Sequence, residues 1–140
     1  MKVNYQETLE KAKEAGFITP EDKYVFCSVA PKEGKRSGSF VEMIYYKYNI
    51  LFVINPKEVK LIDIDQKTGS IVGTHNTISR ENINELSDHW YFFSRDFYLE
   101  AQNSNYRENL LVPGKFKGFK QKELLLEVRN LIKQEFKNEK

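Results

Sequence analysis

The chain has little cysteine, little histidine and almost no excess of charge. Cys27 is its single cysteine, so no disulfide can form within one chain. His75 and His89 are its two histidines. No His-x-x-x-His or Cys-x-x-Cys spacing occurs, so the common zinc motifs are excluded. Lys and Arg total 22 against 20 Asp and Glu, which disfavours a nucleic-acid-binding protein. We therefore expect no metal and no cofactor.

Long apolar runs are also missing. No uninterrupted stretch approaches the roughly 18 apolar residues of a membrane span, so we expect a protein that is not transmembrane. Residues 1–7 contain no apolar segment of signal-peptide length. Together with the single cysteine, this predicts a reducing compartment, most simply the cytoplasm.

Aromatic and β-branched residues are abundant and form strand patterns. Residues 40–54 predict one long strand, residues 55–58 a turn and residues 59–64 a return strand. Residues 23–30 predict an earlier strand that is apolar on both faces, which indicates a central position in a sheet. Further short strands are predicted over residues 70–74, 89–93, 97–101 and 106–112. Residues 94–96 are expected to form a turn, and Ser79 is expected to cap one helical turn.

Two helices are predicted, one near each end of the chain. Residues 5–15 carry a thin apolar stripe, so we expect a short helix that packs weakly or at an edge. Residues 121–136 carry one broad apolar face, formed by Leu124, Leu125, Val128, Leu131, Ile132 and Phe136. Pro20 biases Thr19 away from helical geometry, so we divide the chain into an extension, 1–19, and a domain, 20–140.

These elements predict an α+β fold that is mainly β. About seven antiparallel strands followed by one amphipathic helix fit a small split barrel capped by that helix. The segment from Tyr48 to Val59 is similar to the long strand, polar turn and return strand of the pleckstrin-homology-like (PH-like) fold. The order of elements over residues 21–136 resembles the bacterial PH-like domains in particular. Ile78 and Ile83 match the apolar positions of a short connector in that family, although Ser79 stands where a proline is frequent. The resemblance implies a binding or assembly scaffold.

The first candidate site is the loop after the first predicted strand, with Lys32, Lys35 and Arg36. The resemblance implies an anion-binding position there, because eukaryotic PH domains hold inositol phosphates at this loop. Gly34 and Gly38 would let backbone amides approach a phosphate. The basic residue of the following strand is missing, and Glu42 has the opposite charge. An ordinary solvated loop is therefore the alternative.

The second candidate is a basic patch formed by Lys115, Lys117 and Lys120, with Lys122 beside it. Phe116 and Phe119 alternate with these lysines. Basic residues among aromatic rings bind anionic lipid or stack on single-stranded nucleic acid. The alternative is that both rings anchor the loop to the domain beneath.

No catalytic constellation is evident in the sequence. Cys27 lies in the middle of a predicted strand, where thiols are usually inert. Asp63 and Asp65 are paired carboxylates without an identifiable acid-base partner. We therefore expect a non-catalytic module that mediates protein association, with homo-oligomers formed through exposed strand edges as one form of it. The alternatives are an anionic-lipid or phosphate-binding module that uses the Lys32–Arg36 loop, and a small-molecule carrier or enzyme with a cavity in the sheet.

Overall fold

The computed structural model describes residues 3–30, 48–91, 94–102 and 106–136. Within them, seven antiparallel strands form one sheet in the order β4-β3-β2-β1-β7-β6-β5, and a separate two-stranded hairpin joins the sheet to the last helix. The elements are α1 (Tyr5–Glu14), β1 (Lys23–Ala30), β2 (Tyr48–Asn55), β3 (Glu58–Ile64), β4 (Ile71–Ser79), the 3-10 turn η1 (Arg80–Asn82), β5 (Ile83–Tyr91), β6 (Ser94–Ala101), β7 (Tyr106–Val112), β8 (Lys115–Phe116), β9 (Phe119–Lys120) and α3 (Lys122–Glu135).

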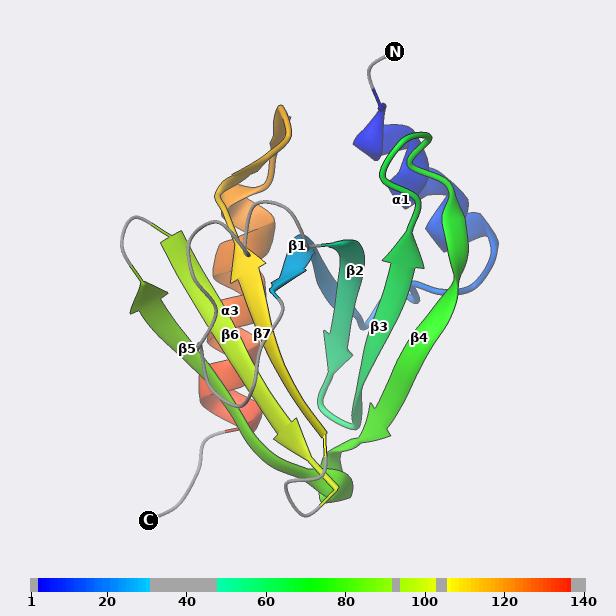
Figure 1. Ribbon diagram of the computed structural model, residues 1–140. Helices are drawn as coiled ribbons and strands as arrows, with labels where there is room; N and C mark the ends of the chain where they lie inside the picture. Colours follow the sequence, from blue (N-terminus) through cyan, green and yellow to red (C-terminus); the bar gives the residue numbers. More distant parts are fainter. Residues whose placement is uncertain (1–2, 31–47, 92–93, 103–105, 137–140) are drawn as a thin grey trace.

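The predicted class, α+β and mainly β with one helix near each end, is confirmed. The predicted barrel is not closed: β4 and β5 are the two ends of the strand order, and no ladder joins them among the described residues. Figure 1 shows the sheet bent into two halves, with η1 connecting the two edge strands at the lower end. The sheet therefore keeps two edges, and α3 packs in one hydrophobic cluster with residues of both halves.

Strand β1 is central, as its two apolar faces predict. Val25 and Cys27 face one hydrophobic cluster, and Phe26 faces the other. All three side chains are fully buried. Strand β2 lies on one side of β1 and β7 on the other, so β1 joins the two halves of the sheet.

Helix α3 packs its apolar face against the larger cluster. Val128, Ile132 and Phe136 are buried there against residues of both halves of the sheet, which include Phe52 and Phe97. In Figure 1 the helix lies behind β5, β6 and β7. This confirms the predicted capping helix. The half-buried Leu131 packs beside the same cluster.

Helix α1 covers the opposite face of the β1–β3 half, with Tyr5, Leu9 and Ala12 buried among residues of the second cluster. These include Phe26, Leu51, Ile62 and Phe116. Three apolar side chains of the thin stripe are therefore buried, because they fill a face that the sheet would otherwise expose. Whether the helix packs weakly or at an edge stays a prediction. The division of the chain after residue 19 stays a prediction.

Other differences lie in the polar strands. Residues 94–96, expected as a turn, belong to β6 and pair with β5. Strand β5 begins at Ile83, well before the predicted residue 89. Its Asn84, Ser87 and Asp88 are poor strand formers, so pairing with β6 decided its conformation against local propensity. Ser79 precedes η1 as expected, but its side chain makes no capping hydrogen bond.

Candidate functional surfaces

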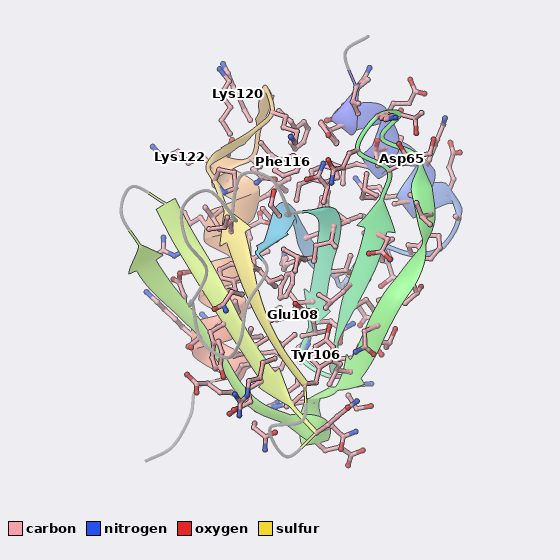
Figure 2. The ribbon with its side chains drawn as sticks, viewed as in Figure 1. Asp65, Tyr106, Glu108, Phe116, Lys120 and Lys122 are labelled. Carbon is pink, nitrogen blue, oxygen red and sulfur yellow. The ribbon has the colours of Figure 1, made fainter. Side chains whose placement is uncertain are left out.

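The two predicted basic sites have different outcomes. Lys32, Lys35 and Arg36 lie outside the described residues. Lys115, Lys117 and Lys120 lie on the β8–β9 hairpin, and Lys122 is the first residue of α3. Figure 2 shows Lys120 and Lys122 at the end of the molecule from which the hairpin projects. We call Lys115, Lys117, Lys120 and Lys122 the hairpin lysines.

The aromatic residues of the hairpin anchor it to the sheet. The Phe116 side chain is 2% exposed, and its ring stacks on that of Phe26 with centroids 5.5 Å apart. Tyr5 meets the Phe116 ring edge-on at 5.2 Å. Phe119 meets the Phe26 ring edge-on at 5.4 Å. The alternative interpretation of these rings is therefore correct: both rings pack inward and anchor the hairpin to the domain beneath.

The hairpin turns through two residues with positive φ. Lys117 has a φ of 47° and Gly118 a φ of 91°, between the paired residues Phe116 and Phe119. This is the pattern of a type I′ turn, in which asparagine, aspartate or glycine is usual at the first position. A lysine there carries a conformational cost, because its Cβ crowds the following carbonyl oxygen.

The lysines of the hairpin are close to one another and exposed. Lys115 and Lys120 are directly opposite across the β8–β9 pair. All four hairpin lysines are exposed, and none takes part in an ion pair with another described residue. The Lys117 ammonium lies 6.0 Å from the centre of the Phe116 ring. Because none of these lysines is ion-paired with a described residue, the hairpin holds uncompensated positive charge. Like charges that face each other across a strand pair are also destabilising.

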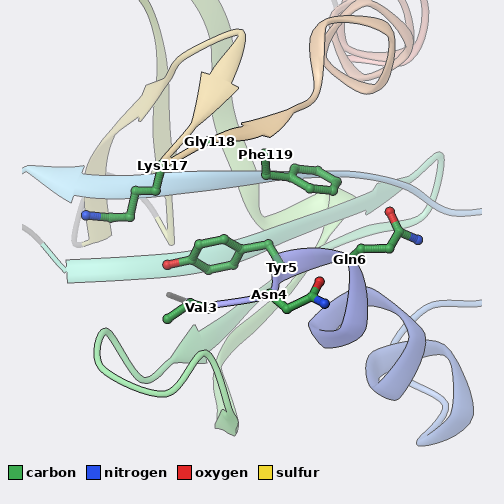
Figure 3. A pocket seen from close by; sticks show the side chains of 7 residues that line it. All are labelled: Val3, Asn4, Tyr5, Gln6, Lys117, Gly118 and Phe119. Carbon is green, nitrogen blue, oxygen red and sulfur yellow. The ribbon is translucent and has the colours of Figure 1, made fainter. Parts of the chain in front are cut away.

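A cavity separates the hairpin tip from the start of α1 (Figure 3). Its volume is about 420 Å³, and it is lined by Val3, Asn4, Tyr5, Gln6, Lys117, Gly118 and Phe119. The Asn4 side chain is engaged in capping α1, since its Oδ1 accepts the Glu7 N–H at 3.1 Å. Lys117 is the cationic group of the lining.

The edge strand β4 is the second surface of interest. From Ile71 to Ser79 it contains no Asp, Glu, Lys, Arg or Pro. Val72 is 68% exposed, and Thr74 and Thr77 are also exposed. Two register shifts disturb its pairing with β3 near Ile62 and Ile64, whereas the half from Asn76 to Ser79 pairs regularly. Sequence patterns did not identify this surface, because an uncharged strand has the same kind of sequence at the edge of a sheet as in its centre.

The opposite edge strand, β5, is protected differently. It carries Glu85 and Asp88, and Arg129 of α3 donates from Nε to the Asp88 carboxylate at 2.8 Å. Charges and a covering helix are common ways of blocking an exposed edge. The two edges of this sheet therefore differ in their readiness to pair.

The remaining candidate groups have structural environments. Cys27 is fully buried, and burial raises the pKa of its thiol well above the usual value, which disfavours the thiolate. Asp65 lies in the exposed turn after β3, and its carboxylate accepts the N–H groups of Lys67 and Thr68. These hydrogen bonds lower the pKa of Asp65, with that from Thr68 acting most strongly. Asp63 is half-buried within β3, so the two carboxylates have separate environments.

Neither helix among the described residues has the length and apolar character needed to cross a bilayer. The chain matches no protein-family model and no curated protein sequence. Among solved structures it is similar to the hSac2 domain from the human phosphoinositide phosphatase Sac2, at 12% identity. That match covers 97% of this chain and 87% of the other, with a TM-score of 0.47. Similarity at this level carries no inference about ligand or activity.

Proposed function

We propose that this protein is a non-catalytic binding module that associates with a second copy of itself by pairing two β4 strands antiparallel. The observation that supports this most strongly is the absence of charged residues and proline from β4, an edge strand in the described sheet. An edge strand presents unpaired N–H and C=O groups, and natural proteins usually block such an edge with lysine, proline or a cover.

The two-fold symmetry of a homodimer favours β4 over β5. When two identical strands pair about a two-fold axis, the same strand surface is used by both copies: if one residue faces a second residue of the partner, that second residue also faces the first. A charged strand would then place like charges close together, which costs stability. Strand β5 would bring the two acidic Glu85 side chains close together, and its Asp88 is already engaged by Arg129 of α3. Strand β4 would bring together only uncharged side chains.

The regular half of β4 provides the most suitable contact. Asn76, Thr77 and Ile78 pair in register with β3, so their backbone is extended for a further strand. Thr77 is exposed and β-branched, a side chain that suits a sheet surface. We therefore place the two-fold axis close to Thr77.

The test is the mass of the assembly in solution, measured by sedimentation equilibrium over a range of concentrations. The wild type is expected to approach twice the chain mass of 16.5 kDa. Thr77→Lys is expected to yield monomers, because it puts two cations beside the proposed two-fold axis. Val72→Lys lies in the irregular half of β4 and is expected to weaken the dimer less. Gln134→Lys is the control, since it adds the same charge at an exposed position of α3.

Two results would reject the proposal. A wild type that stays monomeric at every concentration would remove self-association altogether. A dimer that survives both β4 substitutions would move the interface to another surface. Circular dichroism of each variant establishes that its fold is intact before the masses are compared.

A further inference from the structure

The hairpin lysines form the most concentrated charge on the described part of the chain. Residues 113–122 contain four lysines and no acidic residue. We propose that the β8–β9 hairpin docks this protein onto an anionic membrane surface. This inference concerns a different surface from β4 and is independent of self-association.

The hairpin contains two locally unfavourable features. Lys115 faces Lys120 across the strand pair, and Lys117 adopts a φ of 47°. Locally unfavourable choices of this kind are expected where a surface is kept for binding. An anionic surface relieves the repulsion between Lys115 and Lys120, because it brings negative charge to both.

The lysines are presented by a firmly held element. The buried Phe116 ring fixes β8 on Phe26. At the base of the hairpin, the Gln121 N–H donates to the Gly114 carbonyl oxygen at 2.9 Å. The Gln121 side chain also donates to the Pro113 carbonyl oxygen at 2.7 Å. A pre-ordered hairpin loses little conformational freedom on docking, so more of its electrostatic attraction is expressed as binding.

The chemistry of the patch favours a lipid surface over nucleic acid. Bases stack on exposed aromatic rings, but Phe116 is buried and Phe119 is packed edge-on against Phe26. The patch contains lysine and no arginine. It therefore lacks the planar guanidinium group, which binds one phosphate through two parallel hydrogen bonds. Lysines act as point charges, which suffices for the diffuse negative potential of an anionic leaflet.

The shape of the hairpin also suits a flat partner. Figure 1 shows the β8–β9 hairpin projecting past the end of the sheet, at the same end as the start of α1. The nearest acidic side chain in sequence is Glu123 on α3, beyond the last hairpin lysine. On α1, Glu7 is paired with Lys11 at 3.2 Å, which reduces its repulsion of an anionic surface. A projecting cationic tip can contact a flat surface directly, so this protein needs no binding groove for such a partner.

The experiment is co-sedimentation of the full chain with vesicles. Vesicles of phosphatidylcholine alone are compared with vesicles that also contain phosphatidylserine. The wild type is expected to bind only the second kind, and to be released as salt rises from about 0.1 M to 1 M, where the Debye length falls from about 10 Å to 3 Å. The double substitution Lys115→Gln and Lys120→Gln is expected to weaken binding about 30-fold, because each lysine near the surface is worth about fivefold.

The matched control is Lys57→Gln with Lys133→Gln. These lysines are exposed, lie outside the hairpin and give the same change in net charge. The control is expected to bind as wild type does. Equal loss in both double variants would reject the hairpin as the docking element, as would no dependence on phosphatidylserine. A further outcome is a wild type that binds inorganic phosphate or single-stranded DNA but no vesicles, with that binding lost in the hairpin variant. This result would reject a membrane as the partner of the hairpin. Near-ultraviolet circular dichroism verifies that both variants keep the native fold.

Discussion

The side-chain amide of Gln121 forms a pair of hydrogen bonds with the backbone of Phe26. The Phe26 N–H donates to Oε1 at 2.9 Å, and Nε2 donates to the Phe26 carbonyl oxygen at 2.9 Å. Ser28 of β1 faces Leu111 of β7, so Phe26 would next face Pro113, which has no N–H to donate. Gln121 therefore continues the β1–β7 ladder where β7 ends, and it ties the start of α3 to the central strand.

Replacing Gln121 by alanine is expected to destabilise the protein strongly. Gln121 is 1% exposed, so the Phe26 N–H and C=O would lose their partner inside the protein. Each buried group left unsatisfied costs about 1–3 kcal/mol in free energy of unfolding. Denaturant unfolding measures this loss. Lys122→Ala, at the exposed neighbouring position, should change the free energy by no more than about 0.5 kcal/mol. Equal losses in the two variants would contradict the role given to Gln121.

Ile132→Ala is expected to lower the free energy of unfolding by about 2–5 kcal/mol, because the substitution leaves a cavity in the larger cluster. Ile132 is 3% exposed on the apolar face of α3. Leu126 lies on the same helix but is 52% exposed. Leu126→Ala is therefore the control and should cost no more than about 0.5 kcal/mol. Thermal or denaturant unfolding of both variants tests whether α3 is the cap of the sheet core, and a stable Ile132→Ala variant would show that it is not.

Three glycine substitutions test how α1 is seated on the β3–β4 turn. Gly69 has a φ of 77°, and a Cβ there would collide with Val3 and lie 3.2 Å from Thr8 Oγ1. Gly118 has a φ of 91° with open space around it, and Gly114 has open space. We expect Gly69→Ala to cost most, Gly118→Ala about 1–2 kcal/mol from its backbone alone, and Gly114→Ala to change the free energy of unfolding by less than about 1 kcal/mol. Equal costs at Gly69 and Gly118 would mean that α1 does not press on the turn.

Asp65 is expected to titrate below the ordinary range of an aspartate. Its ionised carboxylate accepts the Thr68 and Lys67 N–H groups, which lowers the pKa in the folded state. The resulting stability is present above the unfolded pKa of about 3.9, and it is lost as pH falls through the lower folded pKa. Asp65→Asn keeps an acceptor oxygen but cannot titrate, so its stability should depend less on pH in this acidic window. Carbon NMR titration of the carboxyl group checks the direction, and an ordinary or raised pKa would refute it.

The sequence by itself determined the local elements whose signals are short-range. The apolar faces of β1 predicted its burial on both sides, and the spacing of Val128, Ile132 and Phe136 predicted the capping helix. The turn after Asn55 was also predictable, since its Oδ1 accepts the N–H groups of Lys57 and Glu58 within three residues. Each of these features depends on neighbouring residues, so the sequence contains nearly all of the relevant physics.

Only the tertiary structure decided how these elements meet. The thin stripe on α1 identified Tyr5 and Leu9 as its packing face, but it did not identify the surface that they cover, because that surface comes from three strands. The pair of hydrogen bonds between Gln121 and Phe26 joins residues that are 95 positions apart. The lysines near residue 115 were visible in the sequence, but the opposition of Lys115 and Lys120 follows from the hairpin register. Likewise, the uncharged character of β4 could be read from its residues, whereas its position at an edge depends on the order of all seven strands. Which distant segments of the chain pair with one another depends on the packing of the whole chain, and no local sequence pattern encodes it.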